Sequence, residues 1–311
     1  MEMLEKGTHI DFMGKRKIAM ALSVALMLAS LVMLFTRGLS FGIDFTGGTL
    51  IEVAYPKAAD LGGIRDVLAE AGFDDAQVQH FGTARDVLIR IAPRGDTASA
   101  KLSEELFTAL SKADPTAEKR RVEFVGPQVG DELTEQGGLA VLYSLIGILI
   151  YVTLRFEWRL SVGAVAALVH DVTITLGVFS LVQVEFDLTV LAAILAVIGY
   201  SLNDTIVVFD RIRENFRRMR KGTPEQVMNT SINQTLSRTL MTSGTTMLVL
   251  VALFIFGGEI IHAFALALIV GVFVGTYSSI FVAGALSLAL GVSKADLMPA
   301  EKEGKEADTA P

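Results

Sequence analysis

Asp204 and Arg238 are the residues whose types and positions most favour chemistry. Asp204, which follows Asn203, lies inside an apolar run at 188–209, and Arg238 stands at the start of the next run at 239–258. One connecting loop makes these runs antiparallel neighbours, so we expect both charged groups at similar depth. An arginine favours the charged form of a nearby carboxylate, whereas apolar surroundings favour its protonated form. The pair is predicted to be a proton-coupling site; the alternative is a structural ion pair, or an aspartate that faces lipid headgroups.

Two further pairs of residues stand out in the apolar runs. His170 and Asp171 are adjacent near the middle of one run, and with Asn203 they could relay protons. The alternative for His170 and Asp171 is a satisfied polar contact that fixes helix packing. Gly271 and Gly275 are four residues apart in the last run, a spacing that allows close approach of a second helix. We expect these glycines to form a packing seam.

The apolar runs that carry these residues are long enough to cross a bilayer. The chain has 311 residues, of which 51% are hydrophobic, and its mean hydropathy is +0.51. About 20 apolar residues of helix span the hydrocarbon core. Six transmembrane helices are predicted, at 18–36, 138–154, 160–182, 188–209, 239–258 and 260–290.

The basic residues of the short loops predict the orientation of these helices. The turns at 183–187 and 257–262 contain no lysine or arginine. Because basic loops stay in the cytoplasm, the N-terminus at 1–17, the loop at 210–238 and the tail at 291–311 are predicted to be cytoplasmic. The acidic stretch Glu301–Asp308 of the tail is expected to be disordered. The basic residues that support this orientation are Lys6, Lys15, Arg16, Lys17, Arg155, Arg159, Arg211, Arg213, Arg217, Arg218, Arg220 and Lys221.

The loop at 210–238 shows two helical signals. Phe209, Ile212, Phe216 and Met219 recur at helical spacing between arginines, which is typical of a helix that lies on anionic membrane lipids. The alternative is a run of charge that serves only to set the topology. Thr223–Gln226 then resembles a capping box with proline at the first helical position, so a second helix is expected to lead into the fifth span.

The segment at 37–137 is predicted to form a periplasmic α/β domain. Its pattern of alternation, helical spacing and turn residues has the order β-α-β-β-α-β, the ferredoxin-like arrangement. Gly72 is the expected stop signal of the first helix. The fold class is therefore a polytopic α-helical membrane protein with one such domain, which is suited to protein docking. The predicted elements of the domain are strand 50–55, helix 60–71, strands 76–81 and 86–91 joined by the turn 82–85, helix 97–113 and strand 121–125.

Composition and missing motifs disfavour several classes of function. A net charge of −7 disfavours nucleic acid as a partner. The chain has no cysteine, so disulfides, thiolate metal sites and cysteine nucleophiles are excluded. The phosphate-binding loop G-x-x-x-x-G-K-[ST], the zinc motif H-E-x-x-H and the nucleophile elbow are all missing. We expect no enzyme activity, no cofactor and no metal, so the energy for any work would come from a partner or an ion gradient.

Several long blocks of the sequence resemble the SecD/SecF family of protein-export membrane proteins. The blocks occur in the family's order and cover nearly the whole chain. The block that begins at Ser201 is the most specific of them. They are Phe41–Thr49, Val125–Gly130, Arg155–Arg159, Ser201–Asn215 and Ile232–Ser243.

The resemblance implies a subunit in the bacterial inner membrane that uses the proton-motive force to promote protein export. The family belongs to the resistance-nodulation-division superfamily, in which two six-helix halves form one unit. This chain carries one half, so the resemblance implies SecD as a separate subunit, with the SecYEG channel complex and exported proteins as further partners. The family's proton-site aspartate falls on Asp204 and its arginine on Arg238.

Two other functions stay open at this point, as does the coupling ion. The chain could be half of a proton-coupled exporter of small molecules or lipids, although its outer domain is small for a substrate cavity. It could also be a passive scaffold of the channel complex. One carboxylate does not distinguish protons from sodium.

Overall fold

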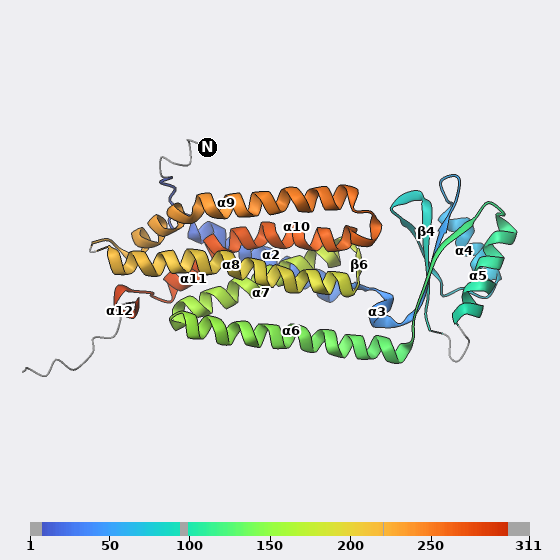
Figure 1. The fold of residues 1–311 in the computed structure, drawn as a ribbon, viewed down its shortest axis with the longest axis horizontal. Helices are drawn as coiled ribbons and strands as arrows, with labels where there is room; N and C mark the ends of the chain where they lie inside the picture. The colour runs from blue at the N-terminus through green and yellow to red at the C-terminus, as the bar shows by residue number, and fades with distance from the viewer. Residues whose placement is uncertain (1–7, 94–98, 220, 298–311) are drawn as a thin grey trace, which may run out of the picture.

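The computed structural model of the chain describes residues 8–93, 99–219 and 221–297. The molecule is elongated, with a helical bundle and an α/β domain beyond one end of it (Figure 1). We refer to this end of the bundle as the domain end. The basic residues Lys6 and Arg220, the predicted helix start at residue 97 and the acidic stretch Glu301–Asp308 lie outside the described residues.

Six of the helices in the described part of the chain are long and apolar enough to cross a membrane, as predicted. The last one begins as α10, passes through a π-helical turn η1 and ends as α11; a short helix α12 follows. Their bounds are α2 Arg16–Thr36, α6 Pro127–Arg155, α7 Trp158–Val182, α8 Leu188–Arg218, α9 Pro224–Phe256, α10 Glu259–Ser278, η1 Ser279–Ala283, α11 Gly284–Ala289 and α12 Lys294–Leu297.

Helices α7 and α8 form the centre of the bundle. Half of the apolar window of each is buried, against 11% for α2, 6% for α6 and 17% for α9. Helix α8 packs on α7, α9 and α10. The outer helices therefore present long apolar faces to whatever surrounds the bundle, as a protein in lipid must.

The segment at 210–238 is mostly helical, as its two helical signals predict, but the boundaries predicted between the spans and a loop there were wrong. Helix α8 continues to Arg218, and α9 begins at Pro224 with the predicted capping box of Thr223 and Gln226. The expected membrane-surface helix was wrong as well: Phe209, Ile212 and Phe216 are at most 3% exposed. Their apolar side packs inside the protein, so the helical spacing reflects a buried face of α8.

The α/β domain has the predicted β-α-β-β-α-β order. Its four-stranded sheet has the order β3-β4-β2-β5, and all neighbouring strands are antiparallel. Gly72, with a φ of 84°, follows the first helix as expected. The turn predicted at 82–85 is shorter, because β4 begins at Thr83 and Gly82 alone turns the chain with a φ of 70°. The elements are β2 Gly48–Ala54, α4 Leu61–Glu70, β3 Gln77–Phe81, β4 Thr83–Ile91, α5 Ser99–Ala113 and β5 Glu118–Val125.

A short segment joins the domain to the bundle. After α2, strand β1 (Ser40–Phe41) pairs in parallel with β6 (Glu185–Phe186), which lies in the turn between α7 and α8. Helix α3 (Ile43–Thr46) follows, and then β2 enters the domain. At this entry Gly48 has a φ of 122°, and a Cβ there would overlap the carbonyl oxygen of Ile91. Only glycine suits this position, because the backbone there has a positive φ and leaves no space for a Cβ atom.

Candidate functional site

The Asp204 carboxylate lies where α8, α9 and α10 meet. Its side chain is 3% exposed. Ser243 Oγ of α9 donates to Asp204 Oδ2 over 3.4 Å, which is a long hydrogen bond. Thr276 Oγ1 of α10 lies 2.8 Å from Ser243 Oγ, and Tyr200 Oη lies 3.3 Å from it. One weakly held carboxylate therefore has a single serine donor, and a threonine and a tyrosine contact that serine.

Arg238 and Asn203 do not join this cluster. Both side chains are exposed, Arg238 on α9 and Asn203 on α8. In the described part of the chain, Arg238 makes no ion pair with Asp204 within 4.0 Å. The structure thus buries one member of the predicted pair and leaves the other on the bundle surface.

Asp171 of α7 is the centre of a second, tighter cluster. Its side chain is 0% exposed, and Oδ2 accepts hydrogen bonds from Ser201 Oγ of α8 at 2.5 Å and from Ser278 Oγ of α10 at 2.7 Å. His170 Nδ1 lies 2.9 Å from Oδ1. The sequence places His170 beside Asp171 but indicates no role for Ser201 or Ser278. These two donors reach Asp171 from other helices, so no local pattern connects them with it.

Polar contacts continue from this cluster to α2. The His170 ring stacks on the Tyr277 ring, with centroids 6.2 Å apart. Tyr277 Oη donates to the carbonyl oxygen of Ala19 at 2.8 Å and lies 3.1 Å from Ser23 Oγ. His170 Nε2 is buried and has no hydrogen-bond partner among the described residues. The first span is therefore joined to the buried histidine through one tyrosine.

Helix α10 contributes to both carboxylate clusters. Thr276 contacts Ser243, the donor to Asp204, and Ser278 donates to Asp171 itself. A Cβ on Gly275 would lie 3.0 Å from Ser201 Cβ, and a Cβ on Gly271 would overlap the side chain of Val197. The two glycines thus lie against α8. Directly after Ser278 the helix widens into the π-helical turn η1, a type of irregularity that often occurs at functional sites.

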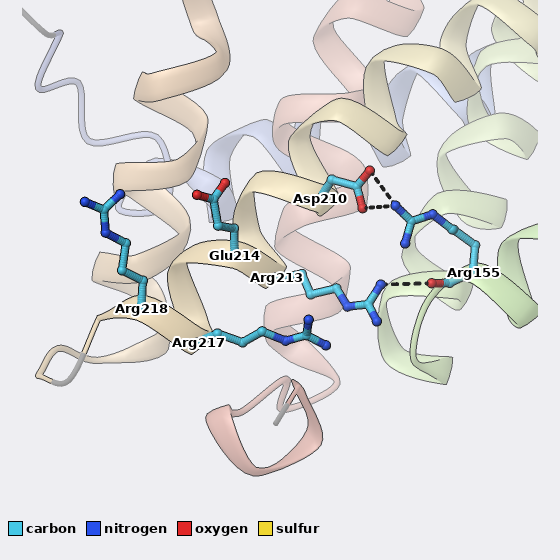
Figure 2. Close-up of a pocket in the computed structure, with 6 residues that line it drawn as sticks. All are labelled: Arg155, Asp210, Arg213, Glu214, Arg217 and Arg218. Atoms are coloured by element: carbon cyan, nitrogen blue, oxygen red, sulfur yellow. Dashed lines mark hydrogen bonds and ion pairs between the residues drawn. The ribbon is translucent and has the colours of Figure 1, made fainter. Parts of the chain in front are cut away.

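An open pocket of about 530 Å³ lies at the end of the bundle opposite the domain. Arg155 Nη2 donates to both carboxylate oxygens of Asp210, at 2.7 and 2.8 Å, and Arg213 Nη1 donates to the carbonyl oxygen of Arg155 at 3.4 Å (Figure 2). These bonds hold the end of α6 against α8. Four arginines and two carboxylates line the pocket: Arg155, Asp210, Arg213, Glu214, Arg217 and Arg218.

Fold and site together define a multi-pass membrane protein with an extramembrane α/β domain and two carboxylate clusters buried among its central helices. In the described residues no group of histidines and carboxylates is arranged to hold a metal ion. Serine, threonine and tyrosine hydroxyls and the His170 ring surround these carboxylates, and such groups can donate or accept protons.

Comparisons with known proteins identify the family. The family model "Protein export membrane protein SecD/SecF, C-terminal" matches residues 105–293, and the model "SecD/SecF GG Motif" matches residues 32–58. The chain belongs to the SecD/SecF family, and its full-length relatives are SecF proteins. The chain is 57% identical to the protein translocase subunit SecF of Vibrio alginolyticus, covering 100% of this chain and 99% of that one. It is 45% identical to that of Escherichia coli O157:H7, covering 99% and 96%.

Solved structures match the fold. The crystal structure of SecDF, a translocon-associated membrane protein from Thermus thermophilus, gives a TM-score of 0.83 at 39% identity. A second SecDF structure, in a super-membrane-facing form, gives 0.68 at 40% identity. In both comparisons the match covers 91% of this chain but only 39% of the solved chain. The solved SecDF is therefore much longer than the part that this chain matches.

Proposed function

We propose that this chain is the SecF-type auxiliary subunit of the Sec translocase and that it uses the proton-motive force, through Asp204, to promote protein export. The observation that carries the proposal is the contrast between the two buried carboxylates. Asp171 has donors at 2.5 and 2.7 Å, whereas Asp204 has a single donor at 3.4 Å. A weakly held carboxylate can gain or lose a proton with little rearrangement of its donors, so it suits a site that turns over.

In this proposal Asp171 and His170 are positioning residues. The carboxylate of Asp171 joins α7 to α8 and α10, and both of its oxygens have close partners. Such a cluster keeps the three helices in register while Asp204 changes its protonation. A relay through His170 is the alternative, and it requires His170 Nε2 to gain a partner that the described residues do not supply.

A separate SecD subunit is proposed to cover the exposed face of α8 and α9. Asn203 and Arg238 are exposed on helices that are apolar enough to cross a membrane. A charged or amide side chain facing hydrocarbon is costly, so such groups usually face protein or a wet cavity. This chain matches only 39% of the solved SecDF chain, so that longer chain has enough further residues to include a second six-helix half. Arg238 would then lie between this chain and SecD.

The domain is proposed to lie outside the cytoplasm and both termini inside. The basic side chains of Arg155, Arg213, Arg217 and Arg218 gather at the end of the bundle opposite the domain. Trp158 nearby is 56% exposed, as is common for tryptophan at the headgroup level. Anionic lipids and the cytoplasmic side of the SecYEG channel are the partners that this basic end would meet.

Export into inverted membrane vesicles tests the function. Vesicles carry SecD with either wild-type chain or Asp204→Asn, and export is measured with and without a proton gradient. We expect the variant to assemble and to lose only the gradient-stimulated part of export. Asp66→Asn, at an exposed carboxylate of α4, is the matched control and should behave as wild type. If Asp204→Asn responds to the gradient like wild type, Asp204 is structural and a passive scaffold becomes the better account of the chain. Replacing the proton gradient with a sodium gradient identifies the coupling ion.

A further inference from the structure

Arg90 of the α/β domain contacts the turn between α7 and α8. It lies near the end of β4 and forms an ion pair with Glu185 of β6. Its Nη1 also donates to the carbonyl oxygen of Phe41 at 2.7 Å. The two side chains of the pair are only 15% and 23% exposed. One arginine thus binds both strands of the small β1–β6 sheet to the domain.

The turn that holds Glu185 is itself firmly attached to the first turn of α8. Asp187, two residues further on, caps α8 by accepting from the backbone nitrogen of Val190 at 2.8 Å. Asp44 of α3 accepts from the backbone nitrogen of Leu188 at 3.0 Å. Any shift or tilt of α8 therefore reaches Glu185 directly, because only two residues separate them.

On the other side, Arg90 belongs to a rigid part of the domain. Strand β4 lies between β3 and β2 and is hydrogen-bonded to both. Its neighbours Ile89 and Ile91 are 0% exposed. A force on Arg90 therefore acts on the whole sheet and not on a loose loop. Figure 1 shows β6 at the domain end of the bundle, beside the segment that leads into the domain.

We propose that the Arg90–Glu185 pair is the contact that transmits movement of α8 to the α/β domain. The inference rests on the proposed function, in which α8 carries the proton site at Asp204. Both residues are positioning residues, since neither touches the buried carboxylate clusters. The pair stays closed while α8 moves, so that domain and turn move as one body. Glu185 faces Asp44 and Asp187 as well as Arg90, and the arginine offsets the repulsion among the three carboxylates.

Two readouts on the whole chain with SecD test the proposal. The first is gradient-stimulated export in the vesicle assay, for Arg90→Gln and for Glu185→Gln. We expect both variants to assemble, to keep gradient-independent export and to lose the gradient-stimulated part. Arg90→Lys keeps the charge and should retain that part. Arg85→Gln makes the same change at an exposed residue of the same strand and should behave as wild type.

The second readout measures the position of the domain and does not depend on export. The chain has no cysteine, so spin labels can be placed at Asp66→Cys in α4 and Glu214→Cys in α8 alone. We expect Arg90→Gln to broaden the distribution of label distances and Arg85→Gln to leave it unchanged. An unchanged distribution in Arg90→Gln overturns the proposal.

The two readouts separate the failure of this inference from failure of the proposed function. If Arg90→Gln broadens the distances but keeps the gradient-stimulated export, the pair is structural and the inference is wrong. If wild type shows no gradient-stimulated export, the proposed function fails. Broadening in Arg90→Gln would in that case still show that the pair positions the domain, but the transmission role would be overturned together with the function.

Discussion

Ser201 Oγ lies 2.5 Å from Asp171 Oδ2 and joins α8 to α7 inside the bundle. The same carboxylate oxygen accepts from Ser278 of α10 at 2.7 Å, so one buried carboxylate connects three membrane helices. A buried polar group that loses its donor keeps the cost of desolvation without the compensating bond. Loss of either serine donor is therefore expected to destabilise the bundle.

Ser201→Ala is expected to destabilise the chain. The substitution removes one donor from a carboxylate that is 0% exposed, at a cost of about 1–3 kcal/mol. Thermal unfolding in detergent measures the loss. Ser111→Ala in the domain helix α5 is the control and should change the unfolding temperature much less. Equal unfolding temperatures for Ser201→Ala and wild type would mean that the Ser201 bond does not hold α8 to α7.

Gly271→Ala is expected to disturb the packing of α10 on α8. A Cβ there would overlap the Val197 side chain, and overpacking of this kind costs about 1–3 kcal/mol. Gly199→Ala in α8 is the control, because no atom lies within 4 Å of the added Cβ. The double variant Gly271→Ala with Val197→Ala should recover part of the loss. A Gly271→Ala chain as stable as the Gly199→Ala chain would argue against the packing seam.

Glu185 is expected to make the stability of the chain depend on pH. Burial raises the pKa of Glu185 above its ordinary value of 4.5; Arg90 opposes this, and Asp187 and Asp44 add to it. Since the folded-state pKa is the higher one, the folded state holds the proton more tightly than the unfolded state. The resulting stability is present below the ordinary pKa and is lost as pH rises through the folded-state value.

The comparison of wild type with Glu185→Gln isolates this effect. Glutamine cannot titrate, so the unfolding temperature of the variant relative to wild type should increase from about pH 4 upward and then level off above the folded-state pKa. The measurement is thermal unfolding of both chains in detergent over that range. If the difference in unfolding temperature between the two chains stays constant with pH, Glu185 has the same pKa in the folded and the unfolded chain.

The ion pair of Arg155 and Asp210 is expected to contribute little to stability. Its side chains are 38% and 40% exposed, and pairs at such exposure are worth about 0.2–1 kcal/mol because water and salt screen them. A double-mutant cycle with Arg155→Gln and Asp210→Asn measures the coupling energy. The coupling should shrink at high salt. A coupling of several kcal/mol that salt does not reduce would show that the pair is more shielded than its exposure indicates.

Sequence alone determined the membrane architecture and pointed to Asp204. Hydrocarbon offers no hydrogen bonds, so each span must be a long apolar helix, and hydropathy detects it. A charge inside such a run stands out for the same reason, as Asp204 and Asp171 did. The domain also followed from its local alternation and helical spacing, because each of its elements is amphipathic.

Tertiary structure decided which residues meet. Ser243 lies 39 residues from Asp204, and Glu185 lies 95 residues from Arg90. Such pairs depend on helix packing, and no local pattern encodes them. The end of α8 was missed for a related reason: spacing shows that Phe209, Ile212 and Phe216 share a face, but not whether lipid or protein covers it. Likewise, Arg90 falls inside the predicted strand 86–91, and only the fold brings it against the turn before α8.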